Sequence, residues 1–131
     1  MALKLRIVTP ARQLVETEAS EVSAPGVVGE FGVLPEHATF LGELEVGAVR
    51  YVENGERKTV VVYGGYAEVS DDVVTILASD AEFPDEIDRA GARAELERID
   101  EELSRPDLET DQVERLLEER RRAEVRLGEA S

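Results

Sequence analysis

The chain has 131 residues, enough for one ordinary domain or for a small domain with an appendage. Its formal net charge of −15 opposes nucleic acid and anionic membrane surfaces as partners, because both are negatively charged. The absence of cysteine and the single histidine exclude disulfides, thiolate chemistry and a metal site with two histidines. A protein partner with basic patches is the expected ligand, and no apolar run is long enough for direct insertion into a bilayer.

The first residues alternate at once between apolar and charged, without the apolar core of a signal peptide. We therefore expect the mature protein to begin here and to work in the cytoplasm or a similar compartment.

Residues 1 to about 80 predict short β-strands. Leu3, Leu5 and Ile7 alternate with charged residues, Asn54-Gly55 predicts a hairpin turn, and Gly64-Gly65 is expected to break a strand. Turns every 8–12 residues are typical of an antiparallel β-sandwich or flattened barrel, here of about ten short strands. Predicted strands include residues 3–7, 15–24, 40–44, 48–52, 59–63, 66–69 and 73–78.

At Phe83-Pro84 the composition changes to glutamate, arginine, alanine and leucine, which predicts helix from Asp85 onward. Pro106 stops the first helix, and Ser104 or Asp107 is expected to cap the second. The predicted domains are a β-sandwich over 1–84 and an antiparallel helical hairpin over 85–131. The apolar stripes are Ala92, Leu96, Ile99 and Leu103, then Val113, Leu116, Leu117, Ala123 and Leu127.

These stripes are thin, so the hairpin is expected to be marginally stable when it is not docked on the sandwich or on a partner. Arg120 falls on the second stripe, where it is expected either to extend its charged end into water or to face a partner.

The most constrained segment runs from Pro25 to Ala38. Glycines at spacings of three, bracketed by prolines, predict tight turns joining very short strands, and such a rigid loop is a good contact surface. The pattern PG-x-x-GE-x-GVLP-x-HA, followed by Phe40-Leu41 and by Leu44-x-x-Gly47, resembles the signature loop of the ATP synthase epsilon subunit. The resemblance extends over essentially the whole chain.

The resemblance implies a non-catalytic rotor-stalk subunit of an F-type ATP synthase. The sandwich would join the gamma subunit to the proton-driven membrane rotor ring, and a movable hairpin would extend to the catalytic alpha/beta head and inhibit ATP hydrolysis. The residues implied in contacts with ring and gamma are Gly29, Glu30, Gly32, Pro35 and His37. From the residues alone, Glu30 and His37 could equally stabilise turns.

A second motif starts the hairpin and resembles the ATP-binding motif of some bacterial epsilon subunits. The family pattern Ile-Asp-x-x-Arg-Ala is matched at Ile87-Asp88, but position 91 is glycine where the motif has arginine. Clustered guanidinium groups suit a triphosphate, whereas arginines among glutamates also form ordinary solvated helix faces. The residues implied in regulatory ATP binding are Glu82, Ile87, Asp88, Arg98, Arg122 and Arg126. No metal or obligatory cofactor is expected.

The missing targeting segment and the intact hairpin favour a bacterial source, with a chloroplast as the alternative. For a bacterial source, the resemblance implies a peripheral protein at the cytoplasmic face of the inner membrane, as part of the ATP synthase complex. The alternative is a free-standing ligand-binding β-sandwich with a helical dimerisation tail, which would need no ATP synthase. An enzyme is disfavoured, because no nucleophile–base motif is visible.

Overall fold

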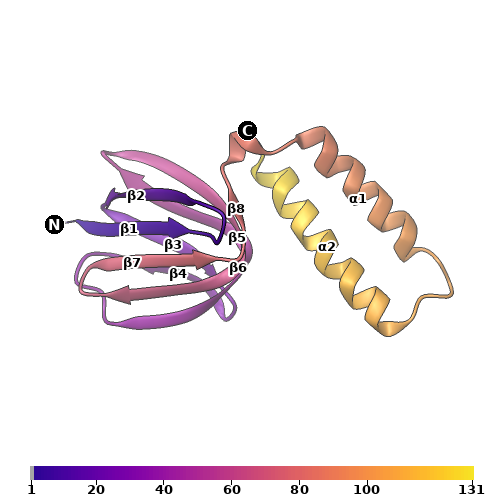
Figure 1. The fold of residues 1–131 in the computed structure, drawn as a ribbon, viewed down its shortest axis with the longest axis horizontal. Coiled ribbons are helices and arrows are strands. Elements are labelled where there is room, and N and C mark those ends of the chain that lie inside the picture. The colour runs from indigo at the N-terminus through magenta and orange to yellow at the C-terminus, as the bar shows by residue number, and fades with distance from the viewer. Residues whose placement is uncertain (1) are drawn as a thin grey trace. The chain divides into compact units, whose positions relative to one another are not determined.

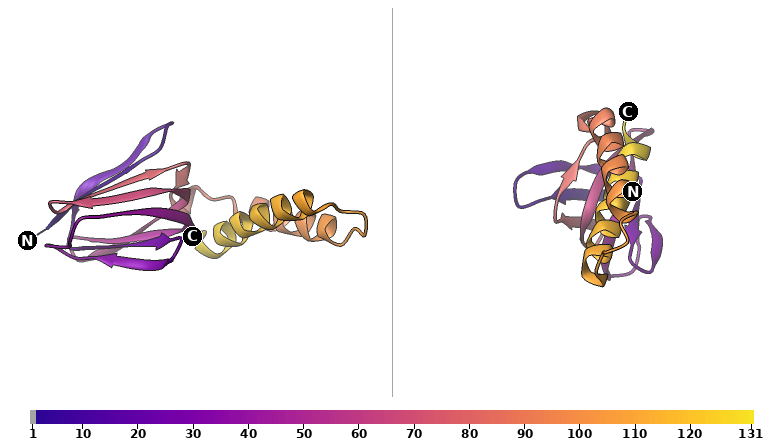
Figure 2. Two further views of the ribbon diagram at one scale, coloured as in Figure 1. Left: turned by 90° about the horizontal axis from the view of Figure 1, so that it is seen from below. Right: turned by 90° about the vertical axis from the view of Figure 1, so that its right-hand side faces the viewer.

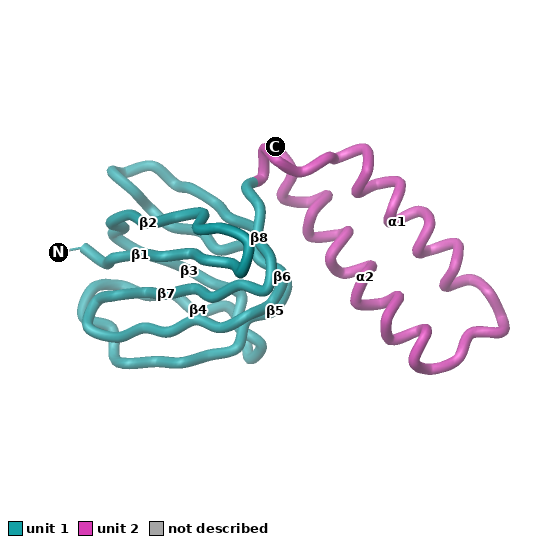
Figure 3. Tube along the Cα trace, in the orientation of Figure 1, with its two compact units in different colours: residues 1–83 teal, residues 84–131 magenta. Residues whose placement is uncertain are grey.

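The computed structural model describes residues 2–131 (Figure 1). Two compact units divide the chain, one ending at Phe83 and the other running from Pro84 to Ser131 (Figure 3). The first unit holds the strands and the second the helices. The strands are β1 (Leu3–Val8), β2 (Gln13–Ala19), β3 (Glu21–Gly26), β4 (Gly29–Val33), β5 (Phe40–Glu53), β6 (Glu56–Ser70), β7 (Val73–Ala78) and β8 (Ala81–Glu82).

The strands follow the order β2-β1-β7-β6-β5-β3-β4, and β8 also pairs with β6. Pairing is antiparallel throughout, apart from the parallel pair β1 and β7. The sheet folds over into two layers (Figure 2), so the long strands β5 and β6 serve both. The predicted β-sandwich is therefore confirmed. β4 and β2 lie at the two ends of the strand order.

The strand count differs from the expected ten, because the described residues form eight. Gly64-Gly65 does not break β6: the strand continues through both glycines, at φ 78° and 128°. A side chain at position 65 would come within 2.1 Å of the Leu77 carbonyl oxygen, so only glycine fits. At this point β6 changes partner from β8 to β7, and its pairing with β5 keeps the same register on both sides of Gly64.

The predicted turn at Asn54-Gly55 is confirmed: both residues have positive φ, at 50° and 79°, as a tight hairpin requires. The expected run over 15–24 instead forms two strands, because the chain turns at Ser20 between β2 and β3.

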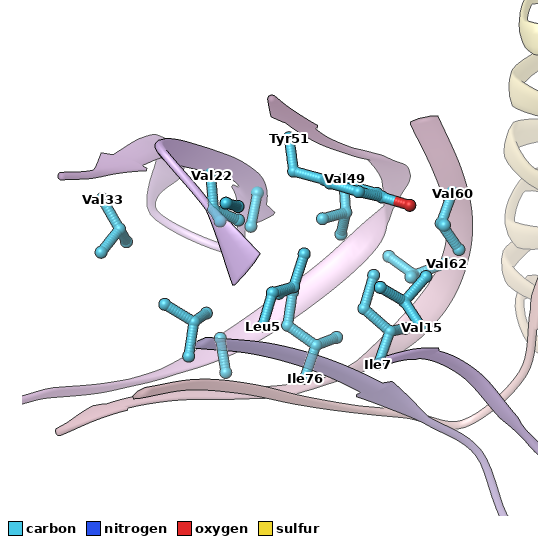
Figure 4. Packing of buried hydrophobic residues seen from close by; sticks show 14 of the residues in the cluster. Leu5, Ile7, Val15, Val22, Val33, Val49, Tyr51, Val60, Val62 and Ile76 are labelled. Carbon is cyan, nitrogen blue, oxygen red and sulfur yellow. The ribbon is translucent and has the colours of Figure 1, made fainter. Parts of the chain in front are cut away.

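The core of the sandwich lies between its layers. Figure 4 shows Leu5, Ile7 and Ile76 pointing toward Val22 and Val49 across this space. All five are at most 2% exposed. The period-two pattern of β1 thus buries one face of the strand and leaves Lys4 and Arg6 in solvent.

The second unit contains a 3₁₀ turn (Pro84–Glu86), α1 (Arg89–Leu103) and α2 (Thr110–Glu129). The α-helix starts at Arg89, later than expected, because the Asp88 carboxylate accepts a hydrogen bond from the Gly91 N–H at 3.0 Å and caps it. The expectation that Ser104 or Asp107 caps the second helix is wrong. Glu109 is the capping residue, and its N–H donates to the Gln112 side chain at 2.9 Å.

A small core joins the two helices. Ile99, Leu116 and Ala123 are buried, and Leu96, Leu103 and Leu108 pack against them. Leu117, expected on the same stripe, is instead 52% exposed. Arg120 reaches from α2 to Asp100 of α1 with Nε–Oδ1 2.6 Å, and also binds Glu124.

Candidate partner-binding surfaces

The signature segment forms the β3–β4 hairpin and the turn that follows it. Val27 and Val28 form the tip, and Val28 is 99% exposed. Gly29 follows at φ 128°, a conformation that favours glycine. Glu30 and Gly32 lie exposed on β4, a strand with a partner on one side only. The apolar hairpin tip and the acidic Glu30 side chain on β4 are therefore both exposed to solvent.

The remaining predicted contact residues lie in the turn after β4. Pro35 and His37 are half-buried, and the His37 N–H donates to the Leu34 carbonyl at 3.1 Å. His37 Nδ1 lies 2.6 Å from the Ala38 oxygen, and its ring packs edge-on to Phe40 with centroids 6.3 Å apart. Part of the role of His37 is therefore to stabilise this turn.

Aromatic rings join the two halves of this segment. The rings of Phe31 and Phe40 lie 4.9 Å apart, and both residues pack against the sandwich core. Phe31 stands between Glu30 and Gly32, while Phe40 contacts His37. The rings thus connect the turn at His37 to the β3–β4 hairpin, whereas Glu30 and Gly32 alternate with Phe31 and point to the other side of β4. We call residues 25–38 the signature loop.

Glu30 also lines a groove of about 560 Å³ on the outer face of β3–β6. Its other charged walls are Glu21, Arg50 and Arg57. Gly32 and Ser23 also line the groove, and their side chains are small. Leu34 adds an exposed apolar side chain to the lining. The groove therefore carries charges of both signs beside the signature loop.

A second exposed surface lies on β5, β6 and β7 and was not predicted from the sequence. Leu77 and Tyr66 are cross-strand partners on β7 and β6, and each is 55% exposed. Leu41, 71% exposed, lies on the same face two residues before Glu43, the β5 partner of Tyr66. Strand alternation could have revealed this outer apolar row, because Ala67, Val69 and Ile76 occupy the inward positions.

The residues of the expected ATP-binding motif fall in both units. Glu82 belongs to the sandwich, where it accepts a hydrogen bond from the Tyr63 hydroxyl at 2.8 Å. In the hairpin, Ile87 is buried and Asp88 caps α1. Gly91, which stands at the motif arginine, occupies the first turn of α1 and donates its N–H to Asp88.

Arg98 is engaged by two acids of its own helix, with N–O distances of 2.6 Å to Glu95 and 3.0 Å to Glu102. The hydrogen bond from Arg98 lowers the pKa of the Glu95 carboxyl, and the charge of Arg126 lowers it further. Of these two arginines, Arg98 pairs with the Glu95 carboxylate directly. Arg122 lies one helical turn before Arg126 on α2 and also has interaction partners of its own.

Within residues 2–131, no group of three or more histidine, aspartate or glutamate side chains is arranged to hold a metal ion. None of the helices described is long and apolar enough to span a membrane.

The family model for the ATP synthase delta/epsilon chain β-sandwich domain matches residues 2–84. The chain belongs to the ATP synthase delta/epsilon chain family. Among curated relatives, the ATP synthase epsilon chain of Solibacter usitatus is 42% identical over 128 residues, covering 98% of this chain and 95% of the relative. The epsilon chain of Nitratidesulfovibrio vulgaris (strain DP4) is 45% identical over 103 residues, covering 79% and 77%. The resemblance to the epsilon subunit, a non-catalytic subunit of the ATP synthase, is thereby confirmed.

Solved structures agree with this family. A chain of the mitochondrial ATP synthase of Euglena gracilis, from an assembly containing OSCP, F1 and the c-ring, matches with a TM-score of 0.75 at 25% identity, covering 98% of this chain and 76% of that chain. A chain from the central stalk and c-ring of the Tetrahymena thermophila enzyme matches with a TM-score of 0.66 at 13% identity, covering 100% and 98%. The second likeness shows the fold alone.

Proposed function

We propose that this epsilon-family chain joins the gamma subunit to the membrane rotor ring, with one exposed surface of the sandwich for each partner. The observation that carries the proposal is the presence of two different surfaces on one β-sandwich. The signature loop, with Glu30 and His37, suits the polar loops of the ring. The outer apolar row of Leu41, Tyr66 and Leu77 suits a permanent contact with gamma, because lasting interfaces bury more apolar surface than transient ones.

Binding to purified gamma and to the detergent-solubilised ring tests this division. Leu77→Glu places a charge in the apolar row and should weaken gamma binding at least about tenfold. A combined Glu30→Ala and His37→Ala variant should weaken binding to the ring and spare gamma. Glu56→Lys, at the exposed tip of the β5–β6 hairpin, is the control and should change neither. Equal affinities for all variants would overturn the proposal and favour a free-standing sandwich.

We further propose that the sandwich (1–84) and the hairpin (85–131) act as separate domains, and that the hairpin inhibits ATP hydrolysis by extending to the alpha/beta head. The small buried cluster of Ile99, Leu116 and Ala123 supports a hairpin that can leave one docking position for another. Complexes assembled with a chain that ends at Phe83 should hydrolyse ATP faster than complexes with the full chain, with coupling to the ring retained. Unchanged hydrolysis would contradict the inhibitory role.

Regulatory ATP binding to the hairpin is a second, weaker proposal. It is supported by the match of Arg98, Arg122 and Arg126 to the family motif, and opposed by Gly91 at the motif arginine. A bound triphosphate would have to displace Glu95 and Glu102 from Arg98. Calorimetric titration of ATP at low magnesium should therefore give weak binding that Arg98→Ala abolishes. No heat up to millimolar ATP would assign these arginines to ion pairs.

The cellular place proposed for this chain is the cytoplasmic face of a bacterial inner membrane, as a peripheral part of the ATP synthase. Cell fractionation should find it in the membrane fraction with gamma and the ring. A chain that stays in the soluble fraction would contradict this placement.

A further inference from the structure

The turn Leu34–His37 in the signature loop has an unusual residue at its third position. The His37 N–H donates to the Leu34 carbonyl at 3.1 Å, and Pro35 occupies the second position. Glu36, the third residue, has φ 70°. Proline at the second position and positive φ at the third define a type II turn, in which glycine is the favoured third residue. Glu36 is therefore held in a left-handed conformation that its side chain disfavours.

A residue distant in sequence holds Glu36 there. The Glu36 N–H donates to Asp72 Oδ1 at 2.6 Å, across 36 positions of sequence. Asp72 lies in the β6–β7 turn, and its own carbonyl accepts the Lys4 N–H at 2.8 Å, which fastens that turn to β1. Asp72 has φ 61°, a conformation that aspartate tolerates better than most residues. A hydrogen bond from an amide to a carboxylate is stronger than one between neutral groups.

We propose that Asp72 is a positioning residue for the signature loop. Its carboxylate holds the Leu34–His37 turn in its type II conformation and so fixes the direction in which Leu34 and His37 meet a partner. A loop ordered before binding loses less conformational entropy when the complex forms, so this bond raises affinity without touching the partner. The inference rests on the proposed role of the loop as a contact with the rotor ring.

The first test measures hydrogen exchange of the Glu36 amide by NMR in the full chain. Asp72→Gly removes the acceptor and leaves a residue that accepts φ 61°. Asp71→Gly is a matched control, because Asp71 lies in the same turn, is exposed, has φ 49° and makes no side-chain bond among residues 2–131. Both variants lose one negative charge.

Asp72→Gly should speed exchange of the Glu36 amide by about tenfold, the effect expected of one lost charge-assisted bond, and Asp71→Gly should not. Asp72→Asn keeps a side-chain acceptor and the tolerance for positive φ but loses the charge, so its exchange rate should lie between those of the native chain and Asp72→Gly. Equal exchange rates in the native chain and in Asp72→Gly would overturn the proposal.

The second test measures affinity for the solubilised ring in two backgrounds. Asp72→Gly should weaken binding by about 3- to 10-fold in the native background. In the Glu36→Gly background, glycine at position 36 adopts positive φ without the hydrogen bond to Asp72. The loss of ring affinity caused by Asp72→Gly should therefore be smaller in that background. An equal loss in both backgrounds would mean that Asp72 acts on binding by another route, and would overturn the positioning role.

The two proposals fail in different ways. If Glu30→Ala with His37→Ala leaves ring affinity unchanged, the loop is not the contact and the proposed function fails. If that variant weakens binding but Asp72→Gly does not, the contact is retained and the positioning role of Asp72 is overturned.

Discussion

The sandwich and the helical hairpin differ sharply in how much each buries. Nineteen residues form one buried cluster in the sandwich, and they include the fully buried Leu3, Leu5 and Ile76. In the hairpin six apolar residues are buried, and only three of them, Ile99, Leu116 and Ala123, form the cluster between the helices. Apolar burial is the main favourable term in folding, so we expect the sandwich to fold as a rigid unit. The free energy of unfolding of the hairpin should be close to zero.

Leu5→Ala should cost the sandwich about 2–5 kcal/mol of unfolding free energy, because a fully buried leucine leaves a cavity between the layers. All three tyrosines lie in the sandwich, so tyrosine fluorescence during guanidinium unfolding reports on this unit alone. Leu77→Ala is the matched control, since Leu77 is 55% exposed and should give a loss of no more than about 0.5 kcal/mol in the isolated chain. Equal losses would contradict the assignment of the core.

Ile99→Ala truncates the largest fully buried side chain of the hairpin. The hairpin has only a small free energy of unfolding, so this loss should be enough to unfold it. The helices should therefore melt while the sandwich remains folded. Circular dichroism at the helix band should fall, and tyrosine fluorescence should keep its native midpoint. Leu117→Ala, at a 52% exposed position of α2, should leave both signals unchanged. Loss of both signals together in Ile99→Ala would show that the units unfold as one.

A polar contact ties β2 to β5 in the sandwich, and its effect should depend on pH. The Glu53 carboxylate accepts hydrogen bonds from Lys58 and Thr17, which lower its pKa from 4.5. The stabilisation is therefore complete above the unfolded pKa and is lost as pH falls through the lower folded value. Glu53→Gln should reduce the thermal midpoint near neutral pH, and the difference from the native chain should vanish in acid. A difference that does not change with pH would contradict this contact.

The smallest effect is expected at the ion pair between the helices. Asp100→Asn removes the partner of Arg120, whose pKa is raised chiefly by that hydrogen bond. Exposed pairs contribute little, so the helix midpoint should fall slightly, and high salt should remove the difference. Glu97→Gln on the exposed face of α1 is the control. A large fall that persists in salt would mean that ion pairs, rather than the buried stripe, hold the helices together.

Local signals in the sequence predicted much of this architecture. Alternation in β1, the Asn54-Gly55 turn, Pro106 and the stripe through Ile99 each depend on neighbours a few residues away. The signature loop could be identified because its glycines and prolines stand close together in sequence.

What sequence could not predict depends on distant partners. Gly64-Gly65 indicated a break, yet β6 pairs with β5 in one register on both sides of Gly64 and stays in the sheet. The bond from Glu36 to Asp72 joins positions 36 residues apart, and no local pattern marks it. Arg98 matched a binding motif, while its pairing with Glu95 and Glu102 appears only once the helix is built.

The contrast between the two units is tested most directly by residue-resolved hydrogen exchange of the isolated full chain. We expect amides of β1, β6 and β7 to exchange only through global unfolding. Amides of α1 and α2 should exchange orders of magnitude faster, through an opening that leaves the sandwich intact. The same high protection in helices and strands would contradict a movable hairpin on a rigid platform.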